Sequence, residues 1–335
     1  MDAGSTSKDL AASIIVPTRN RADLVARFLP SLADQATSEP YEVIYVDNGS
    51  TDSTKDLILE SSERWPHVRM IEERRAGGAR ARHAGALAAR SPLLIFVDDD
   101  MLAEPNLVAE HLRAHKEAPG GCVLGNIISA PGRHPFERMM AYIYDGPKST
   151  LASREPTAQD YWSGNVSISR ELYFRLGGYS EELASLRCGE DMEFGLRMVA
   201  AGIRLRFAER AVTHHHFTER FGARLYRSYR TGIARAYLKE RHPELPIVAV
   251  ATVRSRWRAR AVELFCLAAA RVMEPFAYGK GVPFAPLAFV YELGLRTAAG
   301  RGMIDYAGGR AGQILIPVGD PEKIRPVESL KGMKL

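Results

Sequence analysis

Short apolar segments alternate with helical patterns along the first 120 residues, and this alternation restricts the fold more than any other feature of the sequence. The apolar segments are continuous, which is typical of strands buried on both faces. Repeats of strand, helix and strand predict the α/β class, with a mostly parallel central sheet flanked by helices. The predicted strands are 12–17, 41–47, 68–72 and 93–100, and the predicted helices are 21–35, 50–65, 77–90 and 104–118.

Polar clusters follow three of the predicted strands. They are "PTRN" (17–20), "DNGSTD" (47–52) and "DDD" (98–100). The carboxyl ends of parallel strands meet at one edge of a sheet, where α/β proteins bind ligands. An acidic residue after the second strand, here Asp47, can accept a hydrogen bond from a ribose hydroxyl or a base N–H. Three adjacent aspartates repel one another, so the third cluster predicts either a divalent cation or a solvated acidic turn.

The composition is that of a globular protein with a sizeable core, because 46% of the 335 residues are hydrophobic and 25% are charged. The charge is unevenly distributed. Residues 1–200 carry 22 Lys+Arg and 29 Asp+Glu, a net −7, whereas residues 201–335 carry 23 and 11, a net +12. The basic C-terminal part predicts an anionic partner, which the charge alone leaves open as a phosphate group, a membrane surface or nucleic acid.

The sequence also bears on the cellular compartment. Residues 1–11 are predicted to be a disordered N-terminal segment, polar and without the apolar core of a signal peptide. No stretch approaches the roughly 20 apolar residues of a spanning helix. The three cysteines are far apart and odd in number, which favours free thiols in a reducing compartment. We therefore expect a cytoplasmic protein, peripheral at the cytoplasmic membrane face if its basic part binds lipid.

The strand and helix rhythm changes beyond residue 130. Residues 160–183 read as a loop, a strand, a helix and a Gly-Gly stop, and 187–202 as a helix with acidic residues in its first turn. Two short strands are predicted in 203–217, and arginine-rich helices follow. The predicted organisation is a catalytic domain over 12–217 and a helical, basic extension over 218–335.

Six motifs, in order and at similar spacing, resemble the inverting family-2 glycosyltransferases over residues 12–217. They are "IIVPTRN", "YVDNGSTD", "GGARARHAG", "FVDDDM", "WSGNVSISR…GGY" and "GEDMEFGLR". The resemblance implies a GT-A fold, which is Rossmann-like. It also implies transfer of a sugar, by a hexosyltransferase type of reaction, from a nucleotide diphosphate donor that is usually a UDP-sugar. The cofactor that it implies is Mg²⁺ or Mn²⁺.

The resemblance assigns a metal-binding role to the acidic cluster. Asp98 and Asp100 match the D-x-D motif of the family, and hard carboxylate oxygens suit Mg²⁺ or Mn²⁺. On an extended chain these two side chains point the same way, so Asp100 is assigned to the metal, Asp98 to the metal or the ribose, and Asp99 to support. In "HHH" (214–216), His214 matches the family's late histidine ligand. The alternative for these histidines is a packing or surface feature.

The nucleotide-binding residues implied by the resemblance are Pro17, Thr18, Arg19, Asp47, Arg82 and Asp98. Two of these assignments have simpler alternatives. The alternative for Asp47 is a plain helix-capping turn with Ser50 and Thr51, and the alternative for Arg82 is a surface charge. His83 departs from the family, which usually has asparagine at this position.

The resemblance assigns the chemistry to "GED". Asp191 matches the catalytic base, the single carboxylate that an inverting reaction needs near the acceptor hydroxyl, and Glu190 supports it. The alternative is that both acids favour a helix N-terminus. Trp162, Gly164 and Asn165, in "WSGN", match the loop that contacts the acceptor and the donor sugar.

Two segments of the basic extension could contact a surface: 256–273 is basic and then apolar in an amphipathic pattern, and 282–295 is short and apolar, with prolines and Glu292. Such segments can lie on an anionic membrane surface, or pack on their own domain or on a second subunit of a homodimer. Nucleic acid is disfavoured because no binding module accompanies the arginines.

Two other functions stay open at this point. One is a sugar nucleotidyltransferase on a similar fold, which would lack its glycine-rich N-terminal loop here. The other is a catalytically inactive GT-A binding module. The sequence does not identify the acceptor, which could be a sugar, a lipid-linked sugar or a small molecule.

Overall fold

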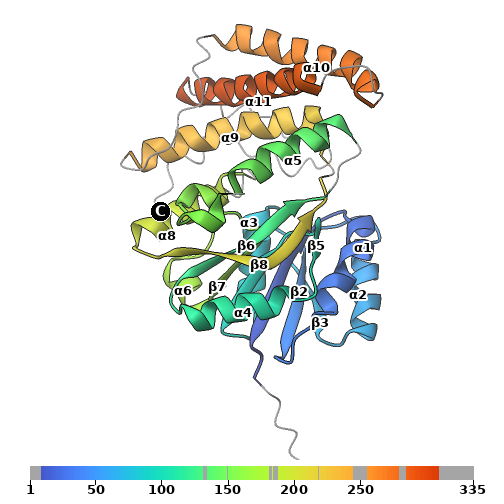
Figure 1. Ribbon diagram of the computed structural model, residues 1–335, viewed down its shortest axis with the longest axis vertical. Coiled ribbons are helices and arrows are strands. Elements are labelled where there is room, and N and C mark those ends of the chain that lie inside the picture. Colours follow the sequence, from blue (N-terminus) through green and yellow to red (C-terminus); the bar gives the residue numbers. More distant parts are fainter. Residues whose placement is uncertain are drawn as a thin grey trace, which may run out of the picture. The chain divides into compact units, whose positions relative to one another are not determined.

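The computed structural model describes residues 9–130, 134–148, 150–180, 183, 188–217, 219–243, 255–278 and 284–308 (Figure 1). Residues 1–8 of the predicted N-terminal segment and 282–283 of the apolar segment 282–295 lie outside the described residues. The chain divides into two compact units. The first comprises Met1–Ala130, Asp145–Ser180 and Asp191–His216, and the second comprises Pro131–Tyr144, Glu181–Glu190 and Phe217–Leu335. The predicted domain boundary at 217/218 stays a prediction.

The first unit contains an eight-stranded sheet in the order β3-β2-β1-β4-β7-β6-β8-β5. Neighbouring strands from β3 to β4 are parallel, β7 is antiparallel to β4 and β6, β8 is parallel to β6, and β5 is antiparallel to β8. The prediction of an α/β, mostly parallel sheet is therefore confirmed. The bounds are β1 Ala12–Thr18, β2 Tyr41–Asp47, β3 Val68–Glu72, β4 Leu93–Val97, β5 Met101–Ala103, β6 Cys122–Ser129, β7 Asn165–Ser169 and β8 Leu205–His215.

Two strand predictions need correction. The fourth strand ends at Val97 rather than at residue 100, because the aspartates form a turn that leads into β5. Residues 203–217 form one strand, β8, instead of two. The register of β6 with β8 shifts between Gly125 and Asn126, as at a β-bulge. Strand β8 continues through this irregularity as a single strand.

The predicted helices of the first 120 residues are confirmed, and helices cover both faces of the sheet. Apolar residues of α1 recur at helical spacing and pack with residues of α4 and of β1, β2 and β4 in one core. The third helix, α3, packs against Ile15 and Val46 through Gly85. The bounds are α1 Ala22–Ala33, α2 Thr54–Arg64, α3 Gly78–Ala88, α4 Leu107–Glu117, α6 Arg170–Arg175 and α8 Glu190–Ala200, with short helices η1 Leu151–Ser153 and η2 Ala158–Asp160.

The second unit is helical, as predicted for the C-terminal part. Its long helices are α9 Phe221–Arg241, α10 Arg256–Tyr278 and α11 Phe284–Ala307, and α5, Pro135–Lys148, contributes its first residues. Glycines allow α9 and α11 to approach closely, since a Cβ atom on Gly232 would lie 1.9 Å from the carbonyl oxygen of Ala299. Among the described residues, no helix combines the length and the apolar character that crossing a membrane requires. All three cysteines are free.

Candidate active site

The three polar clusters predicted to share one edge of the sheet are connected by hydrogen bonds. Thr18, at the end of β1, is in register with Asp47 at the end of β2. The Thr18 hydroxyl donates to Oδ2 of Asp99 over 2.8 Å. Asn20, whose φ is 51°, accepts a hydrogen bond from the backbone N–H of Thr51 over 2.7 Å. The structure therefore brings residues 17–20, 47–52 and 98–100 together.

Asp47 is buried at this edge. Its carboxylate accepts hydrogen bonds from the backbone N–H groups of Gly49 and Ser50, each over 3.1 Å, and Nζ of Lys55 lies 3.6 Å from it. The carboxylate thus closes the turn after β2, whereas the helix α2 begins only at Thr54, with Ser53 as its N-cap. Its contact with a nucleotide stays a prediction.

Arg82 forms an ion pair with the first aspartate of the triplet. Its Nη2 lies 2.5 Å from Oδ1 of Asp98. The arginine side chain is 9% exposed, so the alternative of a plain surface charge is wrong. Its guanidinium also lies 5.9 Å from the centre of the Tyr179 ring. Helix α3 therefore delivers a buried positive charge to the acidic edge.

Asp99 and Asp100 have opposite pKa shifts. Burial, with the neighbouring charge of Asp100, raises the pKa of Asp99 to about 7. Burial also raises the pKa of Asp100, but the hydrogen bond and charge of His215 and the charge of Arg21 outweigh it and lower that pKa below its ordinary value. Near neutral pH the triplet therefore carries less than three full negative charges.

The histidine next to the triplet is His215. Its Nε2 lies 3.4 Å from Oδ2 of Asp100, whereas Nε2 of His214 lies 2.7 Å from Oε1 of Glu104. The antiparallel pairing of β5 with β8 causes this arrangement, because it sets His215 opposite Met101, directly after Asp100. His214, the histidine predicted to meet the metal, is therefore not brought to Asp100.

The donor atoms at this edge fit a hard divalent cation. Oδ1 of Asp100 is buried and has no hydrogen-bond partner among the described residues, which is the condition of a carboxylate oxygen that awaits a ligand. Carboxylate oxygen and imidazole nitrogen are accepted by Mn²⁺, and carboxylate oxygen by Mg²⁺. The set is incomplete by itself, since the described part of the chain holds no group of three His, Cys, Asp or Glu residues arranged for a metal.

Asp191 lies close to a buried tyrosine pair. The hydroxyl groups of Tyr161 and Tyr179 are 2.6 Å apart. Burial is the main cause that raises the pKa of both tyrosines, and the negative charge of Asp191 raises both further, while Arg82 opposes the shift of Tyr179. The charges of Asp191 and Arg82 thus act on the same side chain. Glu190, the predicted supporting acid, is the first residue of α8 and is buried.

The "WSGN" segment packs beside the acidic triplet. The carbonyl of Gly164 accepts from the backbone N–H of Asp98 over 3.3 Å, and a Cβ atom on Gly164 would lie 3.1 Å from Oδ2 of Asp98 and 2.8 Å from Cε of Met101. The close approach that this glycine allows is therefore to Asp98. Trp162 is half-buried and packs against the core.

Asn165 lies inside the sheet. It is 1% exposed, its side-chain oxygen contacts Nε2 of His111 over 2.8 Å, and its Nδ2 donates to the carbonyl of Ala211 over 2.8 Å. Both ends of the amide are thus occupied by the protein. We correct the sequence interpretation here and do not count Asn165 among sugar contacts.

Sequence reasoning missed several residues of this region: Arg21, His215, Tyr161 and Tyr179. Only His215 had a local signal, as a member of the histidine triplet. The other three become neighbours of the aspartates through tertiary packing, which no spacing in the sequence reveals.

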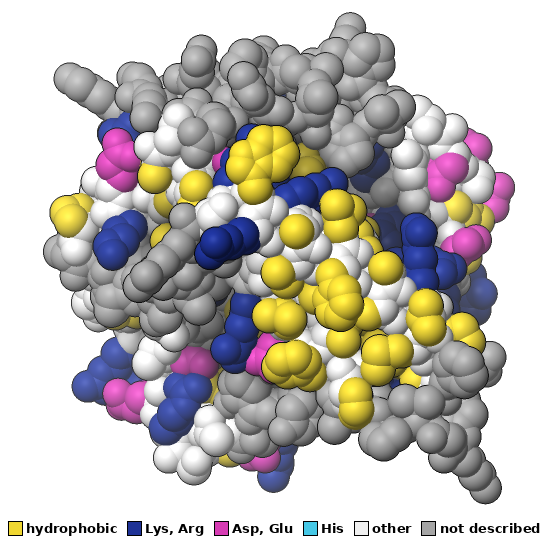
Figure 2. Space-filling model, turned by 90° about the horizontal axis from the view of Figure 1, so that it is seen from above, with side chains coloured by type: hydrophobic (Ala, Val, Ile, Leu, Met, Phe, Trp, Pro, Cys, Tyr) yellow, Lys and Arg dark blue, Asp and Glu magenta, His cyan; other side chains and the backbone are white. Residues whose placement is uncertain are grey.

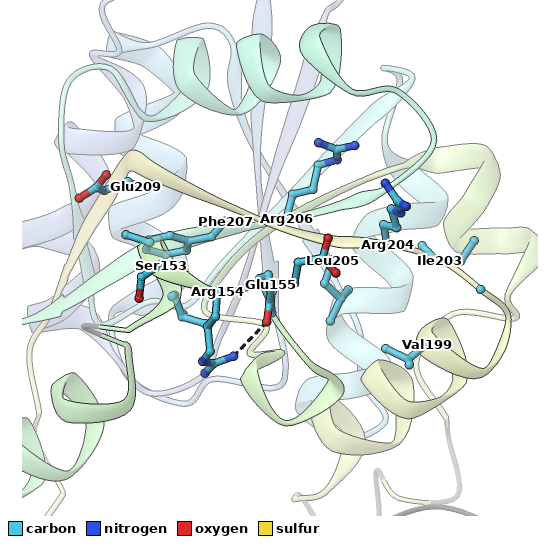
Figure 3. Close-up of a pocket in the computed structure, with 14 residues that line it drawn as sticks. Ser153, Arg154, Glu155, Val199, Ile203, Arg204, Leu205, Arg206, Phe207 and Glu209 are labelled. Atoms are coloured by element: carbon cyan, nitrogen blue, oxygen red, sulfur yellow. Dashed lines mark hydrogen bonds between the residues drawn. The ribbon is translucent and has the colours of Figure 1, made fainter.

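A separate pocket of about 750 Å³ lies in the same unit (Figure 3). One wall is residues 151–156, where Nη1 of Arg154 donates to the carbonyl of Glu155 over 3.2 Å, and the other is the first half of β8 with the end of α8. Figure 3 shows Phe207 of β8 directed toward Ser153. None of the predicted site residues lines this pocket, so it is distinct from the acidic edge.

The comparison with known families decides the class of the protein. The model of glycosyl transferase family 2 matches residues 13–177, which include the acidic triplet and the "WSGN" segment. Residues 13–177 belong to glycosyl transferase family 2. The chain is 33% identical over 229 residues to validoxylamine A glucosyltransferase from Streptomyces hygroscopicus subsp. jinggangensis, a match that covers 60% of the chain and 54% of the relative. The chain spans about half the length of the first curated relatives it matches.

A second relative is glycosyltransferase AglE of Haloferax volcanii, 25% identical over 224 residues, with 66% of the chain and 71% of the relative covered. Among solved structures, mannosyltransferase PcManGT of Pyrobaculum calidifontis, in complex with GDP-Man and Mn²⁺, has a TM-score of 0.60 at 20% identity, covering 88% and 86% of the two chains. S. aureus TarS 1-349 in complex with UDP-GlcNAc has a TM-score of 0.53 at 16% identity, covering 90% and 93%. These two structural likenesses establish the fold, which is GT-A.

Proposed function

We propose that this family-2 glycosyltransferase is a metal-dependent inverting enzyme that transfers a hexosyl group from a nucleotide diphosphate sugar to an acceptor hydroxyl, with a UDP-sugar as the preferred donor. One observation carries the proposal. Asp98 and Asp100 follow the end of the buried strand β4. Asp98 forms an ion pair with the buried Arg82, and Oδ1 of Asp100 is buried without a hydrogen-bond partner among the described residues. Structural neighbours that bind GDP-Man, UDP or UDP-GlcNAc support a nucleotide-sugar donor.

The nucleotide site that we propose consists of Pro17, Thr18, Arg19, Asp47, Arg82 and Asp98. The proposal is supported by the register of β1 with β2, by the hydrogen bond from Thr18 to Asp99 and by the ion pair of Arg82 with Asp98. Arg82 supplies a buried positive charge where a diphosphate would bring negative charge.

The metal site that we propose consists of Asp98 and Asp100, with His215 in place of His214. A bound Mg²⁺ or Mn²⁺ would neutralise charge that develops on the leaving diphosphate. The protein contributes hard oxygen donors and a buried setting, and phosphate oxygens of the donor would complete a ligand set that the side chains alone leave unfinished.

Asp191 is the base in this proposal, and Glu190 supports it. The carboxylate of Asp191 takes the proton from the acceptor hydroxyl, the hydroxyl oxygen bonds to C1 of the sugar, and the bond from C1 to the diphosphate breaks with its electron pair on the diphosphate. Attack from the face opposite the leaving group inverts C1. Trp162 and Gly164 are the acceptor-side residues that we retain.

The decisive experiment is the Asp191→Asn substitution, which removes the basic carboxylate and keeps its size. We expect kcat to fall by about 10²–10⁴-fold, because general-base catalysis contributes about that much, while UDP affinity in the presence of Mn²⁺ stays near wild type. The exposed Glu171→Gln is the matched control and should change neither quantity. Wild-type turnover by Asp191→Asn would show that another group is the base.

A thermal-shift screen would identify the donor. Nucleotides and nucleotide sugars that bind the native state raise its melting temperature, and we expect the largest metal-dependent rise with a UDP-sugar. A rise with nucleoside triphosphate and sugar phosphate, together with formation of a nucleotide sugar, would favour a nucleotidyltransferase. Binding without transfer or hydrolysis would favour an inactive module.

A further inference from the structure

Helix α10 turns an apolar stripe toward solvent. Trp257, Leu264, Phe265 and Val272 are 78%, 52%, 64% and 65% exposed, and Ala261 and Ala268 between them are exposed as well. At 3.6 residues per turn these six side chains fall within an arc of roughly 100°. Figure 2 shows apolar side chains gathered on this face of the second unit. An apolar surface of this extent marks an interaction site.

The opposite face of α10 already has its partners. Ala259, Glu263, Cys266 and Ala270 lie there and are buried. The carboxylate of Glu263 accepts hydrogen bonds from Arg301 of α11 over 2.6 and 3.0 Å. Among the described residues of the second unit, α10 thus packs through the face opposite the stripe.

The charges that border the stripe are positive. Arg256, Arg258, Arg260 and Arg271 are exposed residues of the same helix, and Figure 2 shows basic side chains beside the apolar ones. Two of these arginines are ion-paired, since Nη1 of Arg260 lies 3.2 Å from Oε2 of Glu263 and Nε of Arg256 lies 2.9 Å from Oδ1 of Asp305. Among the described residues, no acid forms an ion pair with Arg258 or Arg271, which therefore supply the positive border of the stripe. Glu263 is buried, and Glu274 accepts a hydrogen bond from the Tyr291 hydroxyl over 2.7 Å. An exposed apolar stripe bordered by arginines is complementary to a surface that is negative outside and apolar beneath.

We propose that α10 lies flat on an anionic lipid membrane, with Trp257, Leu264, Phe265 and Val272 inserted among the acyl chains and its arginines at the headgroups. Tryptophan and arginine suit the interface because each combines an apolar body with a polar or charged end. A second copy of this face fits less well, because a symmetric pair would set arginines against arginines without exposed acids on α10 to balance them. The proposal does not depend on the glycosyl transfer described above.

The test is flotation of the full chain with vesicles of phosphatidylcholine alone or with about 30% phosphatidylserine, which provides the negative surface potential. We expect binding to the anionic vesicles only, and its loss at about 0.5 M salt, where the Debye length shortens to a few ångströms. The double variant Arg258→Glu, Arg271→Glu should fall to the level seen with phosphatidylcholine. Its control is Arg74→Glu, which alters an arginine whose side chain is 91% exposed in the other unit.

The contribution of apolar side chains to vesicle binding can be tested with two leucines of equal exposure. Leu264 on α10 and Leu59 on α2 are both 52% exposed, so Leu264→Ser and Leu59→Ser remove similar surfaces. We expect Leu264→Ser to weaken anionic-vesicle binding about tenfold and Leu59→Ser to leave it unchanged, with circular dichroism intact in both. Equal effects of the two variants, or no binding of wild type to anionic vesicles, would overturn the proposal. So would a concentration-dependent dimer that Leu264→Ser abolishes, because the stripe would then be a contact between subunits.

Discussion

At the scale of single residues, the three aspartates avoid mutual repulsion because each has a different neighbour. Asp98 pairs with Arg82, Asp99 accepts from Thr18, and Asp100 lies beside His215. The pKa of Asp99, raised to about 7, further reduces the charge of the cluster near neutral pH. The triplet is thus tolerated without a cation, yet one buried oxygen of Asp100 is left for a ligand.

The histidines show where residue-scale prediction from sequence stops. In an extended segment His215 points away from the face that His214 and His216 share, and in the structure His216 packs its ring on Phe28. Which of the two faces meets Asp100 depends on the register of β5 with β8. That register is a tertiary property, so the resemblance from which His214 was assigned does not reveal that His215 is the histidine beside Asp100.

The histidine assignment gives a prediction at this scale. His215→Ala should weaken Mn²⁺-dependent UDP binding about tenfold or more, because an imidazole ligand is lost, whereas His214→Ala should leave it near wild type. Asp100→Ala, which removes the carboxylate itself, should weaken it at least as much as His215→Ala. Titration calorimetry with and without EDTA measures these affinities. If His214→Ala gave the larger loss, the original assignment of His214 would be reinstated.

At the scale of elements, α3 positions Arg82 through one glycine. A Cβ atom on Gly85 would lie 2.4 Å from Cγ2 of Ile15 and 3.0 Å from Cγ2 of Val46, so only glycine lets α3 reach β1 and β2. Gly85→Ala should therefore destabilise the protein by about 1–3 kcal/mol, the usual cost of overpacking, although alanine favours helices. Urea unfolding measures the change. Leu87→Ala, at an exposed position of the same helix, should have little effect, and equal costs for both would contradict this packing argument.

A buried polar network between α4 and β7 predicts acid sensitivity. His111 contacts Oδ1 of Asn165 and Oγ of Ser167, and burial lowers its pKa to about 4. In the unfolded chain the histidine titrates near 6.5. Between pH 6.5 and 4 the unfolded state therefore binds a proton that the folded state does not, and the free energy of unfolding decreases as the pH is lowered. The contribution is complete above pH 6.5, amounts to about 3 kcal/mol at most, and is lost as pH falls through 4.

Urea unfolding at several pH values tests this contribution. The wild-type free energy of unfolding should decrease between pH 7 and pH 4.5. In His111→Gln this free energy should be lower at pH 7 and should depend less on pH. His115 adds to the wild-type slope in the same direction, because burial also lowers its pKa. An unchanged slope in His111→Gln would mean that other groups cause the acid sensitivity.

Elements differ in how far the sequence predicts them. The first four strands are continuous apolar runs between polar turns, and the structure confirms them. The three-residue β5 is not predicted, because its partner β8 is distant in sequence, and β8 is predicted as two strands, because its pairing with β6 shifts register at Gly125/Asn126. The role of Asn165 was misjudged for the same reason: its position follows "WSG", but the atoms that surround it come from α4 and β8.

At the scale of the whole molecule, the two units interleave along the chain. The family match covers residues 13–177, yet Pro131–Tyr144 and Glu181–Glu190, inside or just after this range, belong to the helical unit. The Phe136 ring lies 5.4 Å from that of Phe221 and 5.0 Å from that of Tyr291, and Nη2 of Arg138 donates to the carbonyl of Ala277 over 3.0 Å. Residues before the predicted boundary at 217/218 therefore have their partners after it.

This interleaving predicts that a fragment ending at the boundary is unstable. A chain of residues 9–217 would expose the Phe136 ring, which is 1% exposed in the full chain, and would lose the partners of Arg138. We expect this fragment to bind the dye ANS and to unfold at lower temperature than a control chain of residues 9–308. In the full chain, Phe136→Ala should cost about 3–5 kcal/mol, as is usual for a buried aromatic ring. Cooperative unfolding of 9–217 at the temperature of 9–308, without ANS binding, would show instead that residues 12–217 form an independent domain, as the sequence alone predicts.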